Sequence, residues 1–149
     1  MNEAELKTYR KDILEKINRY RFHHQAEDVV LDDAINAFAQ EWATQLAKNN
    51  KLEHRPPGTQ KYGECLYFVT NLKTQDAVKA WYDEVKTVDW KNLEKPDALH
   101  FTQLVWKASK KLGIGIGKSG EGFYYLVANF DPPGNYPGQF NDNVKPKKV

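Results

Sequence analysis

The feature that most constrains the fold is a stretch in which glycine occupies every second position, "LGIGIG" at residues 112–117. Apolar side chains alternate there with positions that carry none, which is the period-two pattern of a β-strand. The "KSGEG" that follows combines glycine with polar residues and predicts a turn. "FYYLVANF" then supplies the aromatic residues that strands favour. The sequence therefore predicts a β-hairpin over residues 112–130.

Helical periodicity dominates the first half of the chain. Apolar residues three and four positions apart predict a helix over about residues 3–23: Leu6, Tyr9, Ile13, Ile17 and Tyr20. A second helix is predicted within residues 31–50, where Asp32 can cap the start and Asn49 and Asn50 mark the end.

Shorter elements complete the prediction. "YGECLYFV" at 62–69 is typical of a strand, and Thr74 can cap a third helix that runs to Val85. Residues 91–98 are expected to form a loop, residues 101–106 a two-faced strand, and the end from residue 131 an irregular segment. Helices gather in the first half and strands in the second, which favours an α+β fold.

Nucleotide and nucleic-acid binding are poorly supported. Gly115, Gly117 and Gly120 match G-x-G-x-x-G, but the dinucleotide fingerprint opens a helix and this match leads into a strand. A P-loop ending in the "GKS" at 117–119 would need glycine at position 112, which is Leu112. The 22 basic and 20 acidic residues are interspersed, so they form no basic patch for nucleic acid.

Cys65 is the only cysteine, so an intrachain disulfide is impossible. A lone strand cysteine is typically a small buried residue rather than a nucleophile, and the two serines, Ser109 and Ser119, lie in settings unsuited to a triad. The first residues are too charged for a signal peptide or a membrane span. We therefore expect an intracellular protein, with an extracellular one as the alternative if a leader has been removed.

Four ionisable residues stand in apolar or structured contexts: His54, Glu64, Glu84 and His100. Their spacing matches no metal-binding motif, and each taken alone fits a structural role better than a functional one. The adjacent His23 and His24 are expected to be exposed at a helix end.

A resemblance to a known family favours a functional role for these four residues. "LHFTQLVWKASKKLGIGIG" is similar to the G-H-[FY]-T-Q-[VL]-V-W-x-x-[ST]-x-x-[LVI]-G-x-G pattern of the CAP superfamily of cysteine-rich secretory, antigen 5 and plant pathogenesis-related proteins. "YGECLYF", "AVKAWYDEVK" and "NYPGQFNDNV" resemble three further family motifs in the same order. The likeness covers nearly the whole chain, and the absence of disulfides makes it most similar to the intracellular Golgi-associated branch.

The resemblance implies a single domain over residues 1–149, folded as a three-layer α-β-α sandwich with a mostly antiparallel central sheet. It also implies that His54, Glu64, Glu84 and His100 meet in one surface cleft. The two histidines would bind Zn²⁺, and the two glutamates would hold its waters or orient the imidazoles.

The chain departs from the family pattern at three positions. Cys65 replaces an asparagine, Leu99 replaces the glycine before the motif histidine, and Ile17 stands where helix 1 usually carries a histidine. None of these departures removes one of the four cleft residues.

The function that the resemblance implies is lipid binding at a membrane surface, with a sterol, a fatty acid or an acidic phospholipid as ligand. The loop at 88–101, with Trp90 and Phe101, matches the position of a sterol-binding loop in relatives. The alternatives are a zinc-dependent protease or esterase, with Glu64 or Glu84 as general base, and a scaffold acting by homodimerisation or through a protein partner. We expect a binding module rather than an enzyme.

Overall fold

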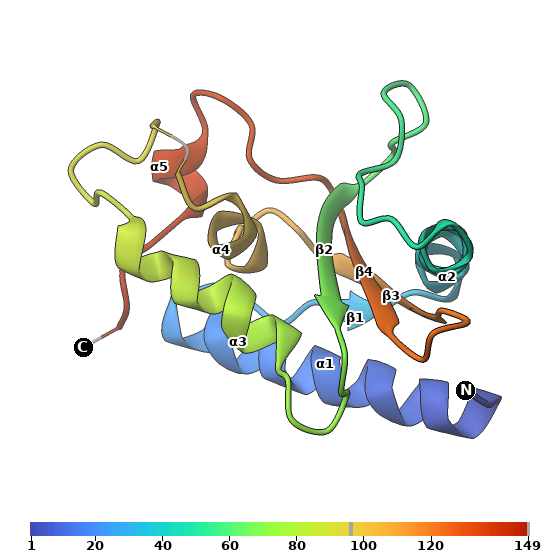
Figure 1. The fold of residues 1–149 in the computed structure, drawn as a ribbon. Helices are drawn as coiled ribbons and strands as arrows, with labels where there is room; N and C mark the ends of the chain where they lie inside the picture. Colours follow the sequence, from blue (N-terminus) through green and yellow to red (C-terminus); the bar gives the residue numbers. More distant parts are fainter. Residues whose placement is uncertain (96, 149) are drawn as a thin grey trace.

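The computed structural model describes residues 1–95 and 97–148, and its centre is a four-stranded mixed sheet (Figure 1). The strands are β1 (Val30–Leu31), β2 (Gly63–Val69), β3 (Lys111–Lys118) and β4 (Tyr124–Asp131), in the order β1-β3-β4-β2. β4 pairs antiparallel with both β2 and β3, whereas the two residues of β1 pair parallel with β3. The predicted hairpin and the 62–69 strand are confirmed, and β1 was not predicted.

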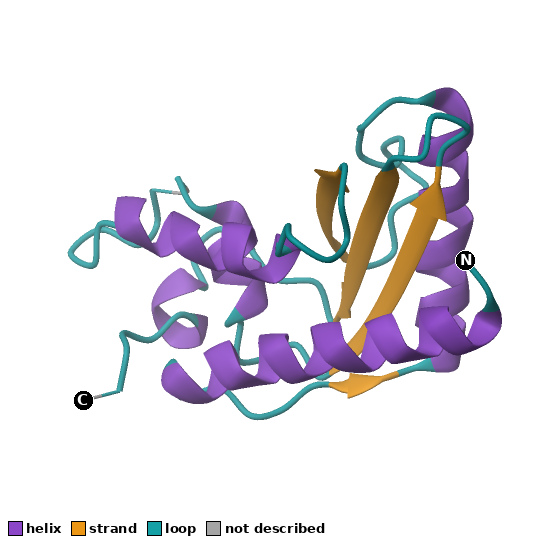
Figure 2. Ribbon diagram, turned by 60° about the horizontal axis from the view of Figure 1, so that its bottom comes forward, coloured by secondary structure: helices purple, strands orange, loops and turns teal. Residues whose placement is uncertain are grey.

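Helices cover both faces of the sheet, which confirms the three-layer arrangement (Figure 2). α2 (Asp33–Asn49) covers one face, where its small residues pack against Leu66 and Val127. The other face is covered by α1 (Glu3–His23), α3 (Ala77–Tyr82) and α4 (Leu99–Leu104). A 3₁₀ helix, η1 (Asp83–Thr87), continues α3, and α5 (Phe140–Asn143) lies near the chain's end.

The helix starts follow from local hydrogen bonds. The Asn2 side chain and Glu5 form a reciprocal capping box on α1. Asp32 accepts the Ile35 N–H at 3.0 Å and caps α2 as predicted. The predicted cap Thr74 is wrong, because α3 begins two residues later and the Asp76 carboxylate accepts the Lys79 N–H.

The alternating glycines of β3 form the seat of α2. A Cβ added at Gly113, Gly115 or Gly117 would lie under 3.0 Å from backbone atoms of α2, at Ile35, Ala39 and Ala43 respectively. Four helical residues rise about 6 Å and two strand residues about 6.6 Å. Every second residue of β3 therefore stays aligned with every fourth residue of α2. The helix backbone therefore lies directly on the bare face of the strand.

Side chains close the outer edge of β3 where β1 has ended. Asn36 accepts the Ile114 N–H at 2.8 Å, and Arg10 Nε donates to the Ile114 carbonyl at 2.7 Å. One helical turn on, Gln40 accepts the Ile116 N–H at 2.9 Å and donates to the Ile116 carbonyl at 2.8 Å. These bonds occupy the backbone groups that an edge strand would otherwise offer to another strand.

The strand predicted at 101–106 is wrong, since Leu99–Leu104 forms α4. Every residue from Phe101 to Trp106 is buried, so the segment has no polar face that would reveal a helical period. The fully buried Arg21 of α1 lies behind α4 and donates to the Leu104 and Trp106 carbonyls at 3.0 and 2.9 Å. The bond to Leu104 satisfies a carbonyl at the end of α4 that the helix leaves free, and the Trp106 carbonyl, beyond the helix, also accepts the Ser109 N–H.

The remaining expectations concern loops and the tail. The predicted 91–98 loop is present in its described part, and residue 96 lies outside the described residues. Through residue 148, the irregular end contains one regular element, the single turn of α5. Across 1–95 and 97–148, no helix has both the length and the apolar composition needed to cross a bilayer.

Candidate functional site: two histidine–glutamate pairs

The first pair joins the loop after α2 to the start of β2. The His54 Nδ1–H donates to Glu64 Oε2 at 2.7 Å, and the Arg55 main-chain N–H donates to the same oxygen at 3.1 Å. The Glu64 side chain is 4% exposed and that of His54 is 59% exposed. The hydrogen bond to the carboxylate raises the pKa of His54, although partial burial opposes it. The pair thus presents a surface imidazole held from beneath by a buried carboxylate.

The second pair lies in the opposite helical layer. The His100 Nδ1–H donates to Glu84 Oε2 at 2.6 Å, while Glu84 Oε1 accepts the His100 N–H at 2.9 Å and the Phe101 N–H at 3.4 Å. The His100 ring stacks on Trp81, with centroids 6.2 Å apart. His100 therefore sits in the first turn of α4 rather than before a strand, and Glu84 of η1 caps that turn.

Cys65 follows Glu64 in β2, and its side chain is buried in the core as predicted. Burial raises the pKa of its thiol, and the nearby Glu84 and Glu64 carboxylates raise it further. A thiol protonated this strongly is a poor nucleophile.

The four predicted site residues form two pairs. Within the described ranges, no three His, Cys, Asp or Glu residues are grouped closely enough to hold a metal ion. Each histidine places its Nδ1 against a carboxylate, which leaves Nε2 as the ring nitrogen that can ligate a metal. Imidazole nitrogens are donors that Zn²⁺ accepts, but within the described residues neither pair has the third protein ligand that catalytic zinc usually has.

The two aromatic residues of the predicted lipid loop differ in exposure, since Trp90 is exposed and Phe101 is buried. Trp90 is 39% exposed, and its ring stacks at 6.3 Å on the His24 imidazole. Phe101 is fully buried in α4 and meets the edge of Trp90 at 6.2 Å. Phe101 is therefore a support for Trp90 and is not available to a ligand at the surface, which corrects its predicted place on the loop.

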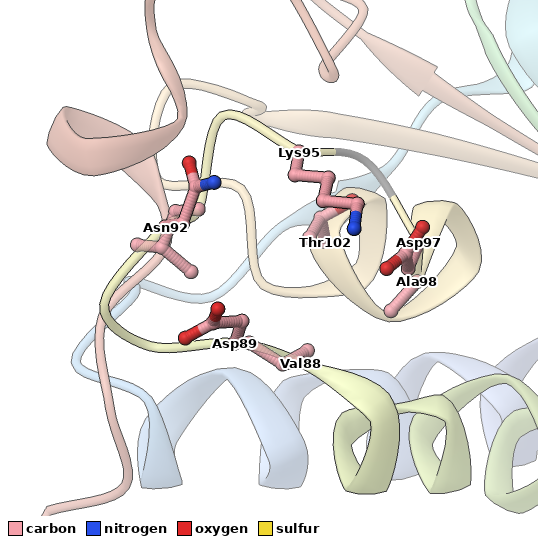
Figure 3. A pocket seen from close by; sticks show the side chains of 8 residues that line it. Val88, Asp89, Asn92, Lys95, Asp97, Ala98 and Thr102 are labelled. Atoms are coloured by element: carbon pink, nitrogen blue, oxygen red, sulfur yellow. The ribbon is translucent and has the colours of Figure 1, made fainter.

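A small pocket lies between this loop and the start of α4, and Figure 3 shows the side chains that line it, among them Val88, Asp89, Asn92, Asp97 and Thr102. Its cavity volume is about 10 Å³, which is room for about one water molecule. Pockets for small organic ligands usually measure about 300–1,000 Å³. The pocket beside the described part of the loop is therefore too small for a lipid.

His24 was predicted to be exposed, and this is wrong, because only 1% of the residue is accessible. Its Nδ1–H donates to the Lys145 carbonyl at 2.8 Å, and Nε2 accepts the Tyr82 hydroxyl at 2.8 Å. Burial lowers the pKa of His24. The sequence does carry a sign of this burial, since His24 continues the α1 stripe four residues after Tyr20 and seven after Ile17.

Comparisons with known proteins agree with this architecture. Residues 14–130 match the family model described as CAP, the cysteine-rich secretory protein family. The human Golgi-associated plant pathogenesis-related protein 1 is 31% identical over 99% of both chains. The tobacco (Nicotiana tabacum) pathogenesis-related protein 1A is 34% identical over 87% of this chain and 78% of the relative.

Solved structures resemble the chain in fold. BmVAL-1 has a TM-score of 0.70 at 23% identity and covers 85% of this chain and 78% of its own. NaASP2, solved with Zn²⁺, has a TM-score of 0.69 at 22% identity and covers 93% of this chain and 85% of its own. Helices on a mostly antiparallel sheet are thus shared with proteins of low sequence identity.

Proposed function

The chain belongs to the CAP family of cysteine-rich secretory proteins, and from that premise we propose that it is a lipid-binding module that associates with acidic membrane surfaces. The observation that carries the proposal is the pair of exposed aromatic residues near the end of α1. Phe22 is 64% exposed and Trp90 is 39% exposed, and Trp90 stacks on His24, two residues after Phe22. Aromatic side chains of this kind partition into the bilayer interface.

The C-terminal segment adds positive charge to the same end of the molecule. The Lys148 N–H donates to the His23 carbonyl at 2.7 Å, and the Lys148 ammonium lies 5.4 Å from the Phe22 ring centre. Lys147 precedes it. Basic residues beside apolar anchors strengthen attraction to anionic lipid headgroups.

The pocket beside the 88–101 loop is too small to enclose a lipid, so at this loop a lipid surface is favoured over an enclosed lipid. A cavity of about 10 Å³ beside the loop cannot take up a sterol or a fatty acid. An acidic phospholipid headgroup needs no enclosed cavity, because it is recognised by charge at the surface. Among the three lipid classes that the sequence suggested, the acidic phospholipid therefore fits best.

Cosedimentation with vesicles tests this proposal. We expect binding to phosphatidylserine-containing vesicles to exceed binding to phosphatidylcholine vesicles, to fall with added salt, and to weaken at least several-fold in Phe22→Ala and Trp90→Ala. Phe68→Ala is the matched control, because Phe68 is 36% exposed but lies on β2. Equal binding by all three variants, or stronger binding of labelled cholesterol than of acidic vesicles, would refute the assignment.

A divalent cation at His54 and His100 is a second candidate function, supported by the two Nδ1–carboxylate pairs and by the relative NaASP2, whose structure was solved with Zn²⁺. Titration calorimetry with Zn²⁺ tests it, with binding expected in the wild type and not in the His54→Ala/His100→Ala double variant. Equal affinity in both would exclude these ligands. Hydrolysis is less well supported, because the described residues group no third protein ligand with the histidines. Only Zn²⁺-dependent turnover that Glu64→Gln abolishes would support it.

The place of action follows from the lipid proposal and from one relative. A human relative is named as Golgi-associated, and a lone buried cysteine suits a reducing compartment. We therefore propose an intracellular protein held peripherally on membranes, with the lipid surface as its partner. Homodimerisation stays a prediction from the sequence.

A further inference from the structure

Three buried side-chain atoms in the described ranges have no hydrogen-bond partner: Arg55 Nε, Glu64 Oε1 and Asn129 Oδ1. Buried polar groups in folded proteins are almost always paired, with protein or with ordered water. One atom belongs to Glu64 itself. The other two belong to Arg55, whose main chain is hydrogen-bonded to Glu64, and to Asn129, which lies opposite Glu64 in the sheet. Their coincidence at one place in the fold therefore calls for a common partner.

The strand register places Glu64 and Asn129 side by side. They are directly opposed on the antiparallel strands β2 and β4, where opposed side chains share a face. Leu66 and Val127, two residues away on each strand, pack with α2, so Glu64 and Asn129 also point to the α2 face. The Asn129 Nδ2 donates to the Gly63 carbonyl at 3.2 Å, whereas its Oδ1 accepts no hydrogen bond from the described residues.

Arg55 meets Glu64 from the loop after α2. Its main-chain N–H binds Glu64 Oε2 at 3.1 Å. Its guanidinium lies 3.6 Å from the Phe38 ring centre, and Nη2 donates to the Phe38 carbonyl at 2.6 Å. The guanidinium is thereby anchored to α2, and Nε is the one part of it that is buried without a partner.

We propose that Arg55 Nε, Glu64 Oε1 and Asn129 Oδ1 form a binding site for a single water molecule. The site offers one N–H donor and two oxygen acceptors, and a water molecule can donate two hydrogen bonds and accept one or two. A metal cation would face the Arg55 N–H and its charge, and an anion would face two acceptor oxygens. Buried water commonly makes about three hydrogen bonds to groups of this kind.

The water gives Arg55 and Asn129 a role in the first histidine–glutamate pair. Glu64 Oε2 is held by His54 and by the Arg55 main chain, and the water fixes the other oxygen. Asn129 and Arg55 are then positioning residues, because they set the orientation of the carboxylate that orients the His54 imidazole. This role depends on neither the lipid nor the metal of the proposed function.

The arginine Nε–H resonances provide a direct test in the intact protein. We expect the Arg55 Nε–H to show cross-relaxation with a long-lived water in ¹⁵N-resolved rotating-frame Overhauser spectra. Arg10 and Arg21 are internal controls, since their Nε–H groups donate to the Ile114 and Glu27 carbonyls and should show no such water. The Arg55 signal should disappear in Asn129→Leu.

A crystal structure that resolves ordered water gives the second readout, which stands even where Asn129→Leu does not fold. We expect one water within hydrogen-bond distance of all three atoms. A direct Arg55 Nε–H to Glu64 bond, or water absent from both measurements, would overturn the proposal. Vesicle and zinc binding are not used, so failure of the proposed function would leave this result unchanged.

Discussion

The fit of α2 on β3 makes a sharp prediction about Gly115. A Cβ at this position would lie under 3.0 Å from the Ala39 carbonyl group and from the Gln40 nitrogen. These neighbours are backbone atoms of a helix and cannot rotate away as a flexible side chain can. In Gly115→Ala, α2 must therefore move off the strand by on the order of 1 Å to restore ordinary van der Waals contact.

Three contributions determine the change in the free energy of unfolding: two lower it and one raises it. Overpacking of this kind costs about 1–3 kcal/mol. The shift would also stretch the two Gln40–Ile116 hydrogen bonds, now 2.8 and 2.9 Å long, each worth about 1 kcal/mol. Loss of glycine's freedom in the unfolded chain returns about 0.4–1 kcal/mol. We expect the free energy of unfolding to fall by about 2–4 kcal/mol.

Urea and thermal unfolding followed by circular dichroism measure this change, with Gly120→Ala as the control. A Cβ at Gly120 meets nothing within 4 Å, and its φ lies outside the left-handed region, so its unfolding free energy should change by no more than about 0.5 kcal/mol. For a chain of this length, the loss in Gly115→Ala corresponds to roughly 4–16 °C in Tm. Equal stability of the two variants would show that α2 does not rest on the bare face of β3.

Three further predictions follow from buried or edge groups. Arg21→Lys should lower the free energy of unfolding by about 3 kcal/mol, because a lysine cannot replace a guanidinium that donates to four carbonyls. Denaturant unfolding measures this change, and a loss below about 1 kcal/mol would contradict the prediction. NMR titration should place the His54 pKa above about 6.5 and the His24 pKa below it, with Glu64→Gln lowering that of His54. The sign follows by linkage: the His54 pair stabilises the fold below pH about 6.5 and loses this as pH rises through its folded pKa, whereas neutral His24 costs stability as pH falls below about 6.5. Gln40→Leu should uncover the Ile116 edge and increase self-association in sedimentation velocity, and an unchanged sedimentation coefficient would count against the edge argument.

The sequence predicted the long elements because each repeats its own hydrophobic pattern several times along its length. α1 and α2 span 21 and 17 residues, so an apolar stripe repeats several times along each helix. The β3–β4 hairpin shows the alternation of a strand with its turn residues in place. α4 was missed because its six residues make fewer than two turns and the last four of them are all buried, so no polar face marks a helical period.

The site was predictable in composition but not in pairing. The resemblance identified His54, Glu64, Glu84 and His100, yet nothing in their spacing says which carboxylate meets which imidazole. That is decided by tertiary contacts, because β2 passes beneath the loop that carries His54 while η1 meets the first turn of α4. The burial of His24 was likewise decided by the C-terminal segment, whose Lys145 carbonyl meets it from 121 residues away.

The two histidine–glutamate pairs should respond differently to one packing change, because they belong to different layers. His54 lies in the loop that leaves α2, whereas His100 stacks on Trp81 in the layer on the other face of the sheet. A displacement of α2 in Gly115→Ala should therefore shift the imidazole resonances of His54 and leave those of His100 within the range seen in Gly120→Ala. Equal shifts at both histidines would mean that the pairs are coupled through the sheet, as the four-residue cleft of the family resemblance implies. Unequal shifts would mean that α2, seated on the glycines of β3, positions the His54 pair on its own.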